Sequence, residues 1–217
     1  LASLGSAQQV MLVPGNHDIY ADDSAAKVSD LWSDYLFHGE PAKTAWPVGE
    51  FPVLRKRGKL SFIGVSSACV TPVFMASGEV GEQQLGRLAE LLRQAEEEGQ
   101  LVCLLIHHPP LPDMTNWRKA LNDAALLQDV LAPLPPPLIF HGHLHHNREI
   151  LWGDSRIYCT SAASSVSDAS YRVNDIEEDK KSWRLKMSLK SISIESGDKP
   201  EFAVVDEQSW ELPKYAG

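Results

Sequence analysis

One stretch near the start of the chain reads Val10-Met11-Leu12-Val13-Pro14-Gly15-Asn16-His17-Asp18. Its first four residues are apolar and predict a short buried strand that ends at Pro14-Gly15. The polar side chains that follow are then placed at a strand end, where sheet proteins build their sites. Asn16 offers an uncharged oxygen to a metal, His17 can donate a proton, and Asp18 can fix the tautomer of that imidazole. Taken alone, the stretch is explained equally well by an Asx-type turn with incidental polar residues.

Two further histidine clusters follow apolar runs in the same way. The run Leu101–Ile106 leads into His107-His108-Pro109-Pro110, and the run Leu138–Phe140 leads into His141-Gly142-His143-Leu144-His145-His146-Asn147. Of the 8 histidines, only His38 lies outside the three clusters. A polar loop or a core histidine explains any one cluster. Three clusters at strand ends instead predict one metal site, because imidazole is the commonest metal-binding side chain.

The periodicity of the chain predicts alternating strands and helices. Apolar residues at helical spacing predict the helices Ser24–Phe37, Glu82–Glu98 and Arg118–Leu131. Shorter apolar or alternating runs predict the strands Phe51–Arg57, Leu60–Val65, Leu101–Ile106, Leu138–Phe140, Arg148–Trp152, Arg156–Cys159, Trp183–Leu189 and Phe202–Val205. This order predicts an α/β layered domain. In the loop after the second cluster, we expect Trp117 to be a buried aromatic anchor, and stacking on a flat substrate group is the alternative.

The composition limits the classes of partner. The 217 residues are 43% hydrophobic, so the chain can bury a substantial core. The net charge of −9 disfavours nucleic-acid polymers and anionic membranes, whereas bound metals would still allow a small phosphate substrate. Cys69, Cys103 and Cys159 form no CxxC pair, and the apolar runs around Cys103 and Cys159 predict reduced core residues and favour a cytoplasmic setting. No apolar stretch in the sequence is long enough to span a membrane.

Three motifs resemble the last three motifs of the calcineurin-like metallophosphoesterases, namely Val13-Pro14-Gly15-Asn16-His17-Asp18, Ile106-His107-His108-Pro109-Pro110 and Gly142-His143-Leu144-His145. The bacterial phosphodiesterase branch of that superfamily is the most similar. The resemblance implies a four-layer α/β/β/α sandwich of two mixed sheets. It also implies a metal-dependent phosphoric ester hydrolase, with two divalent metal ions (Mn, Fe, Zn or Co) and a small phosphoester substrate.

Carried over position by position, the resemblance implies that Asn16, His107 and His143 bind one metal, and that His145 binds the other. A metal-bound hydroxide would attack phosphorus, and His17 would protonate the leaving oxygen or stabilise the phosphoryl charge. Asp18 would orient His17. His108 and His146 receive only supporting roles.

The family also has an Asp-x-His pair and a Gly-Asp motif upstream, and neither precedes Val10. We therefore expect residues 1–217 to form a single metallophosphoesterase domain without its N-terminal part. Three neutral ligands without a bridging carboxylate make a weak site. We accordingly expect this segment alone to bind metal poorly or to be inactive.

Two other functions stay open on the sequence. A non-catalytic scaffold would keep the fold without the chemistry. A mononuclear zinc hydrolase of another fold would need three protein ligands and an open position, which Asn16, His107 and His143 could mimic, although Asn is an unusual zinc ligand. The natural substrate, the choice between diester and monoester, and the oligomeric state are not determined by the sequence.

Overall fold

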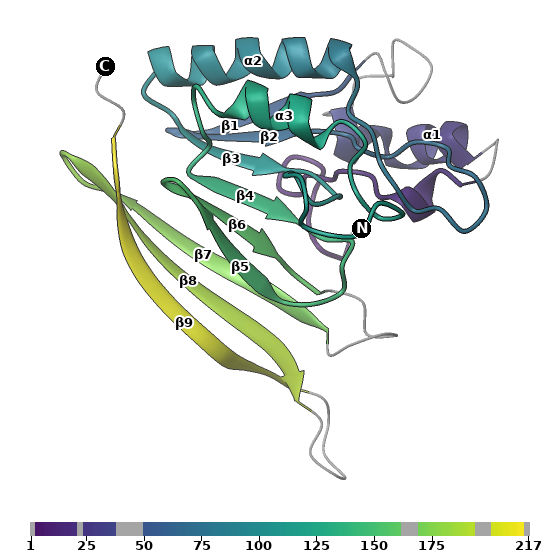
Figure 1. Cartoon of the computed structure of the whole chain (residues 1–217). Coiled ribbons are helices and arrows are strands. Elements are labelled where there is room, and N and C mark those ends of the chain that lie inside the picture. Colours follow the sequence, from purple (N-terminus) through teal and green to yellow (C-terminus); the bar gives the residue numbers. More distant parts are fainter. Residues whose placement is uncertain (1–2, 21–23, 38–49, 162–168, 194–200, 215–217) are drawn as a thin grey trace.

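The computed structural model describes residues 3–20, 24–37, 50–161, 169–193 and 201–214 (Figure 1). Its helical elements are the 3-10 turn η1 (Asn16–Asp18) and the helices α1 (Ser24–Phe37), α2 (Glu82–Glu97) and α3 (Ala124–Leu131). Its strands are β1 (Val53–Arg57), β2 (Leu60–Gly64), β3 (Leu101–Leu105), β4 (Leu138–His141), β5 (Arg148–Trp152), β6 (Ser155–Cys159), β7 (Ser170–Glu178), β8 (Ser182–Ser193) and β9 (Glu201–Pro213). His38, the histidine outside the three clusters, lies outside the described residues.

The first sheet is mixed, with its strands in the order β1-β2-β3-β4-β6-β5. Strands β2, β3, β4 and β6 are parallel neighbours, and the hairpins β1–β2 and β5–β6 each add an antiparallel strand at one edge. A parallel strand covered on both faces needs a continuous apolar run, and Leu101–Leu105 provides it. Both predicted hairpins are confirmed, and each turns at a glycine with φ of 57°, Gly58 and Gly153.

Helices α2 and α3 cover one face of this sheet (Figure 1). The predicted apolar stripe of α2 is buried, with Leu85, Leu88 and Leu92 packed toward the strands. The helix ends just before Gly99, whose φ of 62° suits the left-handed position that follows a helix. The helical spacing of the apolar residues in the sequence therefore predicted the buried face of α2 correctly.

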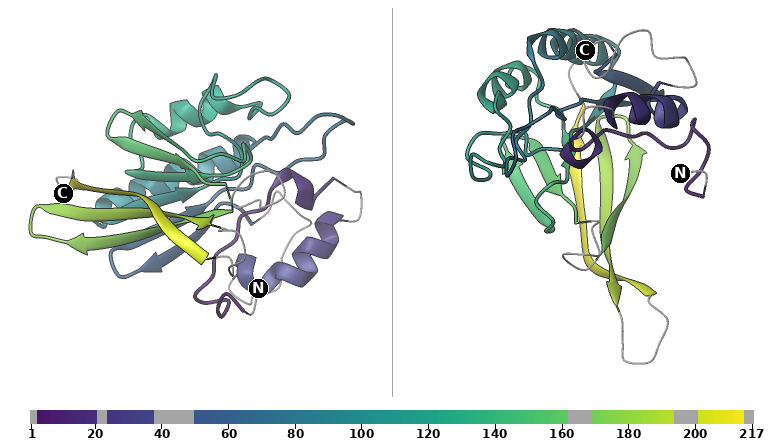
Figure 2. Two further views of the ribbon diagram at one scale, coloured as in Figure 1. Left: turned by 90° about the horizontal axis from the view of Figure 1, so that it is seen from below. Right: turned by 90° about the vertical axis from the view of Figure 1, so that its right-hand side faces the viewer.

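The second sheet, β7-β8-β9, is antiparallel and packs against the opposite face of the first sheet (Figures 1 and 2). The strict alternation predicted for β8 is confirmed, because one set of side chains along it is buried against β3, β4 and β6: Trp183, Leu185, Met187 and Leu189. The expected α/β class with two packed sheets is confirmed. In the described part of the chain, three of the four expected layers are seen, and the outer face of the second sheet carries no helix.

The apolar run Val10–Val13 is not a strand, contrary to the prediction. The buried guanidinium of Arg55 donates to the carbonyl oxygen of Val10, and also to that of Ala7 at 2.8 Å. Met11 still lies against β2, since a Cβ added at Gly64 would be 2.7 Å from Met11 Cε. An apolar run becomes a strand only when a neighbouring backbone pairs with it, and here a side chain takes up the carbonyl groups.

The helix predicted over residues 118–131 begins only at Ala124. The preceding backbone is occupied by a parallel bridge between Gly78 and Leu121, with Asn122 N donating to Gly78 O at 2.8 Å. The Asp123 carboxylate accepts hydrogen bonds from the N–H groups of residues 80 and 81 at 3.0 and 2.7 Å. The contacts with Gly78 use the backbone groups Asn122 N and Ala120 O that a longer helix would need, so the helix does not begin before Ala124.

No strand was predicted for β7, whose apolar residues are few. Cys103 and Cys159 are buried and free, as predicted, whereas Trp117 is 69% exposed, so the prediction of a buried anchor is wrong. Within the described ranges, no helix combines the length and the apolarity needed to cross a membrane.

Candidate metal centre

The second and third histidine clusters meet because their strands are neighbours. β3 and β4 are parallel, with Leu105 opposite Phe140, so both strands end at the same edge of the sheet. Beyond the strands the pairing continues, since Gly142 N donates to His107 O at 3.1 Å. The side chains of His107 and His143 are thereby brought together at the carboxyl ends of the strands.

The first cluster reaches the same place through a close backbone approach. Asn16 is 1% exposed and belongs to η1, whose start is closed by a 2.7 Å hydrogen bond from Gly15 N to Asp18 Oδ2. A Cβ added at Gly15 would lie 2.7 Å from His107 Cε1. The glycine is therefore required for the turn to rest on the imidazole ring.

Asn16, His107 and His143 form a compact triangle of donor atoms. Asn16 Oδ1 lies 2.9 Å from His107 Nε2 and 3.2 Å from His143 Nδ1, and the two nitrogen atoms are 3.2 Å apart. Ligand bonds of about 2.0–2.1 Å place neighbouring donors roughly 2.9 Å apart in octahedral geometry and about 3.3 Å apart in tetrahedral geometry. The three separations fall in this range, so these residues fit one divalent ion.

Burial keeps the two imidazoles of the triangle neutral. Burial, followed by the nearby His141, lowers the pKa of His107 to about 4. Burial, followed by His107 itself, lowers the pKa of His143 to about 4. At neutral pH both rings therefore have a lone pair for a metal. Among the described residues, His143 Nε2 is a buried ring nitrogen without a hydrogen-bond partner.

His108 lies in the same cluster, but both of its ring nitrogens are hydrogen-bonded to the protein. Together with His107 and His143 it forms a group whose ring nitrogens lie within 4.8 Å of one another. Its Nδ1 is 2.8 Å from Ser67 Oγ, however, and its Nε2 is 3.2 Å from Ala76 O. A carbonyl can only accept, so Nε2 carries the proton, and the ring could hold a metal only through Nδ1, by giving up the contact with Ser67 Oγ.

The contacts of His108 were not foreseen from the sequence. Ser67 is fully buried, and a Cβ at Gly78 would lie 2.3 Å from His108 Nδ1. Neither residue belongs to a cluster or a motif, so no local signal marks them. Ser67 and Gly78 support the centre because they position the ring of His108. The centroid of that ring lies 4.4 Å from the ring centroid of His143.

The remaining predicted site residues surround the triangle without joining it. His17 and His145 are exposed, and the charge of each lowers the pKa of His107 and of His143. The ring of His17 packs edge-on against Tyr20, with centroids 5.0 Å apart. Asp18 bonds to the backbone of Gly15 and thereby orders the turn that presents His17.

The loop that holds His143 and His145 has an unusual backbone. Their φ values of 67° and 55° are both in the left-handed region, where side chains other than glycine are strained by about 1–3 kcal/mol each. Leu144 N donates to Gly142 O at 2.7 Å, and the thiol of Cys159 donates to the same oxygen at 3.3 Å. Such strain gathers at functional sites, where the surrounding structure holds it in place.

The sequence of the chain is similar to those of known phosphoesterases. A family model described as calcineurin-like phosphoesterase matches residues 1–147. The chain is 36% identical over 86 residues to the 3',5'-cyclic adenosine monophosphate phosphodiesterase CpdA of Escherichia coli, covering 38% of this chain and 30% of that protein. It is 35% identical over 74 residues to a probable cyclic nucleotide phosphodiesterase of Synechococcus sp., covering 33% of this chain and 28% of that protein.

The matched region is thus under a third of the length of each of these relatives. Among solved structures, a dimetal phosphatase from Danio rerio is 15% identical, with a TM-score of 0.44, over 64% of this chain and 40% of that one.

Proposed function

The chain belongs to the calcineurin-like phosphoesterase family, and on this basis we propose that it is a metal-dependent phosphoester hydrolase. The observation that carries the proposal is the triangle of Asn16 Oδ1, His107 Nε2 and His143 Nδ1, with separations of 2.9 to 3.2 Å. The three residues come from distant parts of the sequence. Their donor atoms converge at the edge of a sheet, with both imidazoles kept neutral.

We assign Asn16, His107 and His143 to one divalent ion and His145 to a second. When bound, such ions act as Lewis acids on the phosphoryl oxygen and make water a stronger acid. Asn16 and the two neutral imidazoles of the triangle carry no charge, so they leave the positive charge of the ion for the phosphate to offset. This local charge would attract a small anionic substrate to a chain whose net charge is −9.

We assign the proton transfer to His17. Its ring is exposed beside the triangle, so a substrate can reach it, and Asp18 orders the turn that carries it. A histidine in this position can protonate the oxygen that leaves phosphorus, a contribution of about 10²–10⁴-fold. The finer part of the proposal is that the substrate is a phosphodiester, with cyclic nucleotides as the first class to test, and that the protein acts in the cytoplasm.

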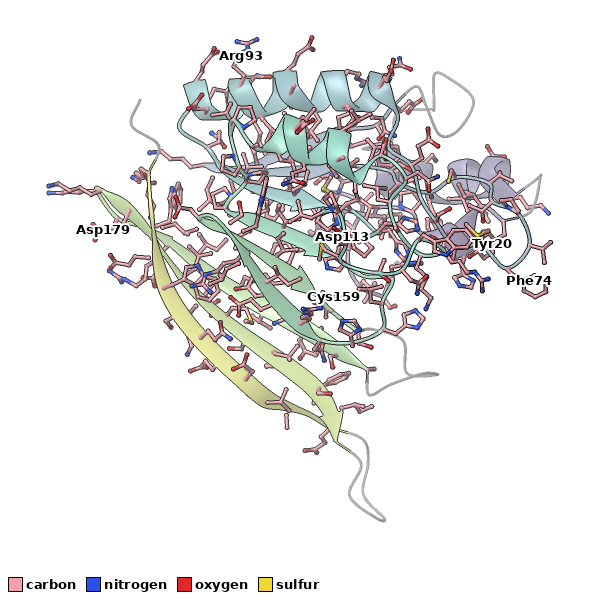
Figure 3. All side chains as sticks on the ribbon, viewed as in Figure 1. Tyr20, Phe74, Arg93, Asp113, Cys159 and Asp179 are labelled. Atoms are coloured by element: carbon pink, nitrogen blue, oxygen red, sulfur yellow. The ribbon has the colours of Figure 1, made fainter. Side chains whose placement is uncertain are left out.

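The proposal is tested by metal content and hydrolysis measured together. The full-length protein should hydrolyse bis-p-nitrophenyl phosphate with Mn²⁺, lose this activity with a chelator, and regain it when Mn²⁺ is restored. Asn16→Ala should lower both metal content and rate, because it removes one corner of the triangle. Arg93→Ala, on the exposed side of α2, is the control and should change neither (Figure 3).

Two results would contradict the proposal. A protein that binds no metal and hydrolyses no phosphoester would be a non-catalytic scaffold with this fold. If Asn16→Ala had the same metal content and rate as the parent, the triangle would not be the metal site that supports hydrolysis.

A further inference from the structure

The loop between β2 and α2 exposes large apolar side chains. Val70, Val73 and Phe74 are 65%, 81% and 92% exposed. Single apolar residues on a surface are ordinary, but a group of them on one loop marks a binding surface. Phe74 also has a φ of 69°, an outlier for a bulky side chain, and such strain clusters at ligand sites.

This loop borders a cavity of about 490 Å³, lined by Tyr20 and by residues 71–76. The volume lies within the range of about 300–1,000 Å³ that is typical of small-molecule sites. None of the lining side chains is charged, and two of them, Tyr20 and Phe74, are aromatic. Figure 3 shows both at the end of the molecule opposite Asp179.

The shape of the loop is held by its own hydrogen bonds. Thr71 Oγ1 donates to Met75 O at 2.9 Å, and Met75 N donates to Pro72 O at 3.0 Å. Ala76 N donates to Arg118 O at 2.8 Å, which ties the loop to the segment before α3. A loop that is already ordered loses little conformational entropy when a ligand binds.

Two residues of the cavity wall contact the residues of the candidate metal centre. Asn16 Nδ2 donates to the hydroxyl of Tyr20, so one corner of the donor triangle touches the cavity wall directly. On the other side, His108 Nε2 bonds to Ala76 O at 3.2 Å. Tyr20 therefore borders both the triangle and the cavity, which puts the cavity next to any ligand whose phosphate lies at the triangle.

We propose that the cavity binds the flat heteroaromatic part of the phosphoester, a nucleobase, against the rings of Tyr20 and Phe74. This inference rests on the proposed hydrolase function and names the substrate class of the same site. An uncharged wall with two aromatic rings binds a base by stacking, which is tolerant of base identity. The exposed Trp117 does not line the cavity, and the guanidinium of Arg118 lies 5.3 Å from its ring centroid.

The test compares two ligands that differ only in the base. Adenosine 5'-monophosphate and ribose 5-phosphate are titrated by calorimetry into the full-length protein with Mn²⁺, where the readout is affinity and not turnover. The parent should bind the nucleotide at least about tenfold more tightly, since stacking of a base typically supplies such a factor. Phe74→Ala should remove most of this difference and leave the affinity for ribose 5-phosphate unchanged.

Trp117→Ala is the matched control, because it removes an aromatic ring that is also exposed but lies outside the cavity, and it should change neither affinity. Equal affinities for the two ligands in the parent, or an undiminished preference in Phe74→Ala, would overturn the inference. The second result would be expected if the loop docked another protein. If the parent bound neither ligand, the premise that a phosphoester binds at the triangle would be wrong, and the inference would fail with it. Failure of the hydrolase function would be seen separately, as a lack of bis-p-nitrophenyl phosphate hydrolysis.

Discussion

Asn16 Oδ1 lies 2.9 Å from His107 Nε2, although 91 positions separate the two residues in the sequence. The contact depends on Gly15, because only a residue without a Cβ lets the turn rest on the imidazole ring. The first and second clusters are therefore joined by backbone packing as well as by their donor atoms. This relationship makes the centre sensitive to changes that leave every donor in place.

Replacing Gly15 by alanine should weaken metal binding without removing a ligand. The added Cβ would lie 2.7 Å from His107 Cε1, so the turn or the ring must move. We expect a loss of about 1–3 kcal/mol in the free energy of unfolding, measured in urea, and a clearly lower Mn²⁺ affinity. Gly86→Ala is the control, since a Cβ there meets nothing within 4 Å and alanine favours the helix. An unchanged Mn²⁺ affinity in Gly15→Ala would show that the close approach is not needed.

His17→Ala should separate proton transfer from metal binding. The exposed imidazole is not part of the donor triangle, so the variant should keep its metal content. The rate should fall by about 10²–10⁴-fold for a diester with an alkyl leaving group. The loss should be smaller for a p-nitrophenyl ester, because p-nitrophenolate leaves without being protonated. Equal losses for both esters would argue against an acid role for His17.

The metal-free protein should lose stability on mild acidification. Burial, followed by the charge of His143, lowers the pKa of His108 in the folded protein to about 3, from an ordinary value of 6.5. His108 therefore binds a proton in the unfolded chain at a pH where it stays neutral in the folded chain. The free energy of unfolding decreases as the pH falls from about 6.5 toward about 3. By about pH 5, His108 alone should account for roughly 2 kcal/mol.

Urea unfolding measured between about pH 8 and about pH 5, with a chelator present, checks this prediction. Ring-nitrogen chemical shifts of His108 should report the neutral tautomer with the proton on Nε2 over the same interval. A free energy of unfolding that stays constant or rises on acidification would contradict it.

Ser67→Ala should destabilise the folded protein, because Ser67 holds the ring of His108 beside the centre. The hydroxyl is buried, lies 2.8 Å from His108 Nδ1 and accepts a bond from His108 N at 3.2 Å. Its loss leaves both atoms of His108 unpaired, at an expected cost of about 1–3 kcal/mol. Ser33→Ala, a half-buried position of α1 whose hydroxyl makes a 3.3 Å bond to Asp30 O, should stay within about 0.5 kcal/mol of the parent. Equal effects of the two substitutions would mean that the bonds to His108 contribute little.

Much of the fold could be predicted from local patterns. The stripe of α2, the two glycine hairpins and the alternation along β8 each follow from a repeat that neighbouring residues carry by themselves. The prediction failed for Val10–Val13 and for the start of α3. In both places a distant group, the guanidinium of Arg55 or the backbone of Gly78, takes up hydrogen bonds that the local pattern had assigned to a strand or a helix.

The amino-acid sequence alone determined the family resemblance, the α/β class and the residue types available for a metal, because motifs and periodicity are properties of neighbouring positions. Only the tertiary structure decided that Asn16, His107 and His143 form one triangle while His145 stays exposed outside it. It also decided that His108 is held by Ser67 and Ala76, and that Tyr20 links the triangle to an apolar cavity. The physical reason is that strand register, positive φ values and close approaches at glycine depend on contacts between residues far apart in the chain.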